Sequence, residues 1–130
     1  MPSTVRRPAV AGTFYPADPV SLDADVRRYL ASALPVDLDF QPRILIVPHA
    51  GYVYSGPVAA TGYQLIEPMD HIRRIVMLGP SHYVWFTGLA LPGDDLLETP
   101  LGIVAVDADA AARVADNLLV AVSTEAHERE

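Results

Sequence analysis

The hydrophobic pattern of the chain is marked by two short apolar runs, residues 43–47 and 73–78. Each has the length of one strand, and an unbroken apolar run is typical of a parallel strand that is buried on both faces. Between them, residues 58–66 have a helical composition, and Pro57 suits the first turn of a helix. This order predicts a βαβ unit, a motif of about 30 residues or more.

Apolar residues at helical spacing predict two further helices. One covers residues 21–34 with Ser21 as its N-cap, and the other covers residues 107–119 with Asp107 as its N-cap. Serine and aspartate suit this position because their side-chain oxygen accepts a hydrogen bond from the first helical turn. Both helices are expected to flank the sheet.

Strand-like segments complete the pattern. Residues 87–91 and 102–106 predict either the two arms of a hairpin around the turn-forming residues 92–95 or two short strands. Residues 120–122 predict another short strand, and the proline-punctuated residues 1–20 indicate an extended segment. The expected fold class is therefore α/β, a layered sheet with βαβ units and flanking helices.

The composition is that of one domain or of a part of one. A hydrophobic content of 51% over 130 residues supports a core and excludes a disordered chain. No apolar run approaches the roughly 20 residues that cross a bilayer, and no signal peptide follows Arg6 and Arg7, so a cytoplasmic protein is expected. The polar residues 123–130 include no element that folds back, which predicts an incomplete domain.

Charge and cysteine content exclude several classes of protein. The formal net charge is −7, and the nine basic residues are scattered arginines, whereas a nucleic-acid interface needs a concentrated basic face. The chain contains no cysteine, which excludes disulfides, thiolate metal sites and cysteine nucleophiles within these residues. Neither nucleic acid nor membrane is expected as a partner.

The candidate chemistry lies at the ends of the two predicted parallel strands. His49 follows residues 43–47, and His82 follows residues 73–78. Because parallel strands end at the same sheet edge, about 4.8 Å from their neighbours, the two imidazoles are expected to converge on one site. Histidine is the commonest metal ligand and titrates near neutral pH, so the pair predicts a metal site or an acid–base site. The alternative is that each is a hydrogen-bonded loop residue.

Hydroxyl side chains adjoin both histidines. Tyr52, Tyr54 and Ser55 follow His49, and Ser81 precedes His82. We expect these four to line the pocket, where their hydroxyls suit the orientation of a ligand. Ordinary packing explains the tyrosines equally well, since tyrosine is often half-buried with its hydroxyl at the surface.

A site with two histidines needs a third ligand, such as the carboxylate of the facial triad in non-heme iron enzymes. Asp94, Asp95 and Glu98 lie in a plausible loop, but turn chemistry explains them at least as well. None is assigned as a ligand, and no catalytic residue is assigned. His71 and His127 are surrounded by charged residues and are expected to be solvated.

Four motifs follow one another in a specific order: RPAVAGTFYP at residues 7–16, PHAGYVYSG at 48–56, LGPSH at 78–82 and TPLG at 99–102. With these motifs the chain resembles the Memo family, whose bacterial and archaeal members are called AmmeMemoRadiSam system protein B. The resemblance covers nearly the whole sequence. It makes residues 1–130 the N-terminal part of a single Memo-like domain.

The resemblance implies an α/β fold related to the class III extradiol dioxygenases, which are non-heme iron enzymes. It also implies that His49 and His82 correspond to the pocket histidines of the family, which can bind a metal ion such as iron or copper. Family members carry a later histidine in a Glu-His-Ser segment and a later cysteine, and the segment would begin at Glu130. Radical-SAM and AMMECR1-like proteins are the partners that the resemblance implies.

Two functions are compatible with these observations. In the first, the histidine-lined pocket binds a divalent metal and supports redox chemistry in the full-length protein, as in a metal-dependent oxidoreductase. In the second, the chain is a non-catalytic binding module. The tyrosines and the helix N-terminus next to His49 would then hold a peptide or a protein partner.

Overall fold

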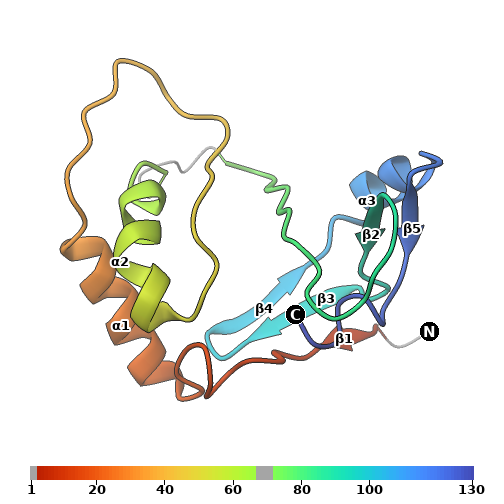
Figure 1. Ribbon diagram of the computed structural model, residues 1–130, viewed down its shortest axis with the longest axis horizontal. Coiled ribbons are helices and arrows are strands. Elements are labelled where there is room, and N and C mark those ends of the chain that lie inside the picture. Colours follow the sequence, from red (N-terminus) through yellow and green to blue (C-terminus); the bar gives the residue numbers. More distant parts are fainter. Residues whose placement is uncertain (1–2, 67–71) are drawn as a thin grey trace. The chain divides into compact units, whose positions relative to one another are not determined.

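The computed structural model describes residues 3–66 and 72–130, in which three helices and five short strands form (Figure 1). The chain divides into two compact units, and each is described by itself. The helical unit is Ala11–Arg73, and the sheet unit is Met1–Val10 together with Arg74–Glu130. The mixed α/β class is confirmed. None of the described helices is long and apolar enough to cross a membrane.

The helical unit contains α1 (Pro19–Ala31) and α2 (Tyr52–Tyr63). Asp18 caps α1, because its carboxylate accepts the backbone N–H of Ser21 at 2.8 Å. Pro19 takes the first helical position, where a missing N–H costs nothing. The prediction of Ser21 as the cap is wrong, since Ser21 lies within the first turn.

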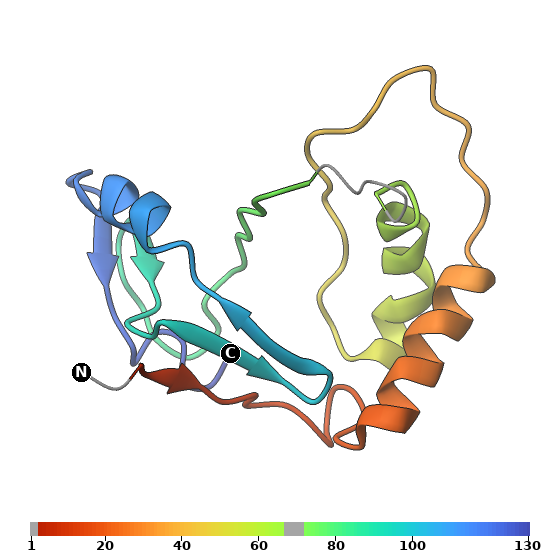
Figure 2. The ribbon, with the colours of Figure 1, turned by 180° about the vertical axis from the view of Figure 1, so that it is seen from behind.

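The two helices pack side by side, as both ribbon views show (Figure 2). Leu22 of α1 and Ala60 of α2 are each only 3% exposed. Gly56 of α2 allows the close approach, because a Cβ at this position would lie 2.8 Å from the ring of Tyr29 on α1. Small residues on α2 therefore decide how closely the helices pack.

The sheet unit is built around β3 (Leu96–Thr99), the middle strand of three. It pairs in parallel with β1 (Val5–Arg6) and antiparallel with β4 (Gly102–Ala105). The hairpin in the structure therefore joins β3 to β4. The prediction that residues 87–91 form the first arm of this hairpin is wrong, whereas the alternative of two short strands within residues 87–91 and 102–106 is confirmed.

A second sheet in the same unit pairs β2 (Leu89–Leu91) in parallel with β5 (Val120–Val122). Between β4 and β5 the chain forms α3 (Ala108–Ala115). Asp107 caps α3, as predicted, by accepting the N–H of the residue three positions on at 2.9 Å. The second carboxylate oxygen of Asp107 accepts a hydrogen bond from Arg74 Nε at 2.6 Å. This contact connects the start of α3 to the chain around Arg74.

Residues 43–47 and 73–78 form no strand, so the predicted layered sheet with a βαβ unit is not what the described residues adopt. Each run contains strongly exposed side chains: Ile46 keeps 96% and Met77 keeps 81% of its surface open to solvent. A strand forms only where a neighbouring backbone satisfies its N–H and C=O groups. An apolar composition indicates that these side chains favour burial, but it does not provide a neighbouring strand for the backbone to bond to.

The cap at Asp18 should make the protection of the Ser21 amide depend on pH. The hydrogen bonds from the hydroxyl and the backbone N–H of Ser21 lower the pKa of Asp18 below its ordinary value of 3.8. A lowered folded-state pKa stabilises the helix above pH 4 or so, and this contribution is lost as acid protonates the carboxylate. We expect the Ser21 amide to exchange faster with solvent as pH falls through that range, after correction for intrinsic exchange.

Two variants separate the charge of Asp18 from its capping oxygen. Asp18→Asn keeps an acceptor oxygen and should show no acid-induced opening, whereas Asp18→Ala should show an unprotected Ser21 amide at every pH. Amide hydrogen exchange followed by NMR measures both. Identical exchange in the wild type and in Asp18→Ala at neutral pH would contradict the assignment of the cap.

Candidate functional site

The loop that carries His49 is fixed from two sides within the helical unit. Ser55 is buried, and its Oγ accepts the backbone N–H of Ala50 at 2.8 Å. Gly51 is the N-cap of α2, which begins earlier than predicted, so Pro57 lies inside the helix and not in its first turn. The Ser55 hydroxyl thus holds the turn between the histidine and the helix.

The first of the four sequence motifs supports the same loop. The backbone N–H of Tyr52 donates to the carbonyl oxygen of Phe14 at 2.7 Å. A Cβ at Gly51 would lie 3.3 Å from that carbonyl oxygen, so glycine permits the two segments to lie this close. Two motifs that are far apart in sequence therefore build one support for His49.

The two tyrosines after His49 differ in their surroundings. The Tyr52 ring lies 5.5 Å from the Tyr15 ring and 6.3 Å from the Tyr29 ring, between centroids. Burial raises the pKa of the Tyr52 hydroxyl, so Tyr52 is neutral at physiological pH. Tyr54 is 82% exposed. Packing therefore accounts for Tyr52, while Tyr54 presents its ring to solvent.

His82 lies in the sheet unit, where a carboxylate holds both its ring and its backbone. The Nδ1 atom of His82 is 2.7 Å from Oε2 of Glu130, and the backbone N–H of His82 donates to Oε1 of the same side chain. Burial favours a higher pKa for Glu130, but the hydrogen bonds from His82 outweigh it, and the pKa lies below its ordinary value. Ser81 donates its hydroxyl to the carbonyl oxygen of Val84 at 2.7 Å, which closes the turn around His82.

The segment that ends in Glu130 is packed against the sheet unit. Ala126 is 4% exposed. The Nε2 atom of His127 is 3.0 Å from the carbonyl oxygen of Ala90 in β2, so the prediction that His127 is a solvated residue is wrong. Arg6 in β1 donates from Nε to the carbonyl oxygen of His127 at 2.9 Å. Sequence reasoning placed Glu130 only at the start of the Glu-His-Ser segment that the resemblance implies, and it assigned the Glu130 side chain no role.

Two of the three acids considered as a third ligand have structural partners of their own. Asp95 accepts the backbone N–H of Thr4 at 2.9 Å, and Glu98 lies 3.4 Å from a guanidinium nitrogen of Arg7. Asp94 lies in the connection between β2 and β3. Within residues 3–66 and 72–130, no three His, Asp or Glu side chains gather as a set of metal ligands.

The predicted convergence of the two motif histidines stays a prediction. His49 belongs to the helical unit and His82 to the sheet unit, and the structure describes each in its own unit. His71 lies outside the described residues. What the structure adds is the local support of each histidine: a glycine and serine turn for His49 and a carboxylate for His82.

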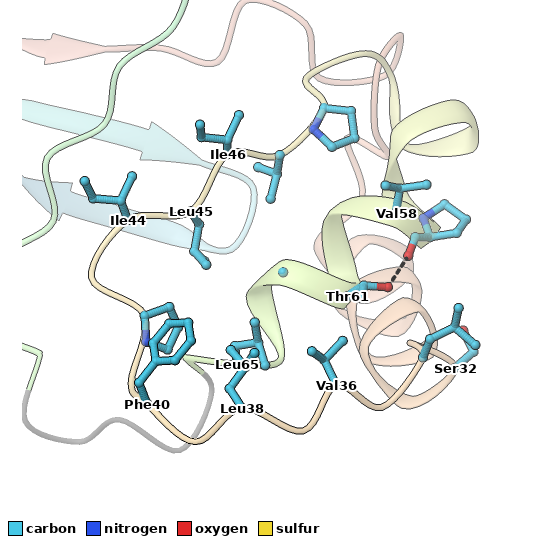
Figure 3. Close-up of a pocket in the computed structure, with 16 residues that line it drawn as sticks. Ser32, Val36, Leu38, Phe40, Ile44, Leu45, Ile46, Val58, Thr61 and Leu65 are labelled. Atoms are coloured by element: carbon cyan, nitrogen blue, oxygen red, sulfur yellow. Dashed lines mark hydrogen bonds between the residues drawn. The ribbon is translucent and has the colours of Figure 1, made fainter.

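A pocket of about 710 Å³ opens in the helical unit, between the chain that follows α1 and one face of α2 (Figure 3). Its walls are mostly apolar, with Phe40, Ile44 and Ile46 on the loop side and Val58 and Leu65 on the helix side. Neither His49 nor the tyrosines that follow it line this pocket. It is therefore distinct from the predicted histidine site.

Comparison with known proteins places the chain in a family. The family described as "Memo-like protein" matches residues 6–130. A MEMO1 family protein of Aquifex aeolicus is 41% identical over 109 residues, which cover 81% of this chain and 38% of the relative. A MEMO1 family protein of Saccharomyces cerevisiae is 37% identical over 105 residues, 79% of this chain and 31% of the relative.

An archaeal relative extends the match. The MEMO1 family protein of Nitrosopumilus maritimus is 35% identical over 117 residues, which cover 87% of this chain and 42% of the relative. The chain thus spans about two fifths of the length of most of these relatives. With a family match over nearly its whole length, which confirms the resemblance of the four motifs, the chain belongs to the Memo family.

Proposed function

We propose that this Memo family protein binds a divalent metal ion through His49 and His82 in a shared pocket. The metal is iron or copper, and in the full-length protein it supports redox chemistry. The proposal rests on the two motif histidines and on the rigid loops that carry them. The proposed lining of this pocket is the four hydroxyl side chains next to the histidines, Tyr52, Tyr54, Ser55 and Ser81.

The contact between His82 and Glu130 is the observation that carries the proposal. A histidine that binds a metal almost always donates its other ring N–H to a carboxylate, a carbonyl or a water. The 2.7 Å separation of His82 Nδ1 and Glu130 Oε2 provides that arrangement. Imidazole nitrogens suit iron and copper, so the donor chemistry of the chain fits the proposed ions.

The fold relationship, the location and the partners of the protein are part of the same proposal. The full-length domain is proposed to be related to the class III extradiol dioxygenases, with a facial set of ligands that leaves positions open. The protein is proposed to act in the cytoplasm as an AmmeMemoRadiSam system protein B. Radical-SAM and AMMECR1-like proteins are its proposed partners, and a pull-down with each tests them.

Metal titration of the full-length gene product tests the site. Calorimetry with Fe²⁺ and with Cu²⁺ should give one strong site in the wild type. His49→Ala and His82→Ala should each weaken it tenfold or more, because coordination depends on every donor being held in place. His71→Ala, which lies outside the predicted site, is the matched control and should bind as the wild type does.

The result that would overturn the proposal is equally clear. If the double variant His49→Ala/His82→Ala takes up as much iron and copper as the wild type, the pocket has no role in binding. Circular dichroism of each variant must match the wild type, so that a loss of binding is not a loss of folding.

A further inference from the structure

Glu130 makes two contacts with one residue that lies 48 positions earlier in the chain. Its Oε2 is 2.7 Å from the ring Nδ1 of His82, and its Oε1 accepts the backbone N–H of the same residue. Both carboxylate oxygens are therefore committed to His82. A side chain held at the ring and at the backbone has little freedom to rotate.

We propose that Glu130 is a positioning residue for His82. The carboxylate accepts the Nδ1–H, which selects the tautomer whose lone pair is on Nε2. It also fixes the plane of the ring. This inference rests on the proposed metal site, and it names Nε2 as the atom of His82 that coordinates the metal.

The segment around Glu130 is built to hold the carboxylate in place. The guanidinium carbon of Arg129 lies 4.1 Å from the ring centroid of Tyr83, the residue after His82. Two consecutive residues at the C-terminal end thus contact two consecutive residues of the loop. A turn precedes them, in which the backbone N–H groups of His127 and Glu128 donate to the carbonyl oxygen of Thr124.

Loss of this support should be measurable at the ring itself. In the full-length gene product without metal, near pH 8, long-range ¹H–¹⁵N correlation spectra report which ring nitrogen of His82 carries the proton. We expect the Nδ1–H tautomer in the wild type and a shift toward Nε2–H in Glu130→Ala, which removes both acceptor oxygens. Glu128→Ala, at an exposed acid two residues away, is the matched control and should leave the spectrum unchanged.

Metal affinity provides the second measurement. Removal of an outer carboxylate that orients a histidine ligand typically weakens metal binding 10-fold to 100-fold. We therefore expect calorimetric Kd values for Cu²⁺ or Fe²⁺ to rise about 10-fold to 100-fold in Glu130→Ala. Glu128→Ala should bind as the wild type does.

The outcomes separate this inference from the proposed function. An unchanged His82 tautomer in Glu130→Ala overturns the positioning role. A shifted tautomer with unchanged metal affinity overturns it as well. If the wild type takes up no metal, the proposed function fails. A tautomer shift in that case still supports the orientation of the His82 ring by Glu130.

Discussion

On its own, the 130-residue chain should bind the dye ANS strongly and unfold in urea without a sharp two-state transition. Among the described residues, the buried apolar side chains are Leu22, Ala60 and Ala126, and two of these are alanines. Exposed apolar surface binds the dye, and loss of specific packing removes cooperativity. Far-UV circular dichroism should nevertheless report helix, because α1 and α3 are capped by local contacts.

Substitution in the two apolar runs shows whether they are the source of dye binding. Ile46→Thr/Met77→Thr replaces one strongly exposed side chain in each run and should lower ANS fluorescence with little change in helix content. A sharp urea transition with no dye binding by the wild-type chain would contradict the open arrangement of these runs.

Gly88→Ala should cause the largest loss of stability of any single glycine substitution in the sheet unit. Gly88 has φ of +91°, and a Cβ there would lie 2.1 Å from the carbonyl oxygen of Leu119. That oxygen accepts the N–H of Leu89 at 2.8 Å, which begins the pairing of β2 with β5. Relief of the clash requires the backbone to move, so the β2–β5 pair should separate.

The expected cost combines two effects. A left-handed backbone costs about 1–2 kcal/mol for a residue other than glycine, and overpacking against fixed atoms costs about 1–3 kcal/mol. The free energy of unfolding of the full-length gene product should thus fall by about 2–5 kcal/mol. Urea denaturation measures this change.

Gly79→Ala is the matched control for Gly88→Ala. A Cβ at Gly79 would meet no atom within 4 Å, and its φ is not positive. This variant should unfold within about 0.5 kcal/mol of the wild type, as surface substitutions usually do. Equal stability of the two variants would show that β2 and β5 do not approach each other as described.

The start of α3 was predictable from the sequence, whereas α1 and α2 begin at other residues than predicted. Asp107 was assigned as the cap of α3, and its carboxylate does accept an N–H from the first turn. Capping is a contact between residues three positions apart, so the sequence contains all of it. The wrong cap at α1 is also separated from the true one by three residues. Asp18 and Ser21 both have side chains suited to a cap, and only the backbone conformation selects Asp18.

Strand pairing was far less predictable. Residues 102–106 were expected to pair with residues 87–91, but β4 pairs with β3 instead, and β2 pairs with β5. In the observed pairs, the backbone N–H and C=O groups of each strand bond to the strand that the tertiary fold brings next to it. The apolar runs at residues 43–47 and 73–78 have strand composition and remain outside both sheets.

In the candidate site, too, local features were predicted and long-range contacts were not. His49 and its supporting glycine and serine lie within a few residues, and motif reasoning identified all of them. The role of the Glu130 side chain was not predicted, because it depends on a contact across 48 positions. The Phe14 carbonyl that accepts the Tyr52 N–H was hidden for the same reason, although both residues belong to motifs.

By itself, the sequence determined the family, the α/β composition and the segments that form helices, because motif order and capping are properties of nearby residues. Only the tertiary structure decided which strands pair and which carboxylate meets His82. The physical reason is that a strand or a ring nitrogen is satisfied by whichever partner the folded chain brings within hydrogen-bond distance. That partner can lie anywhere in the sequence.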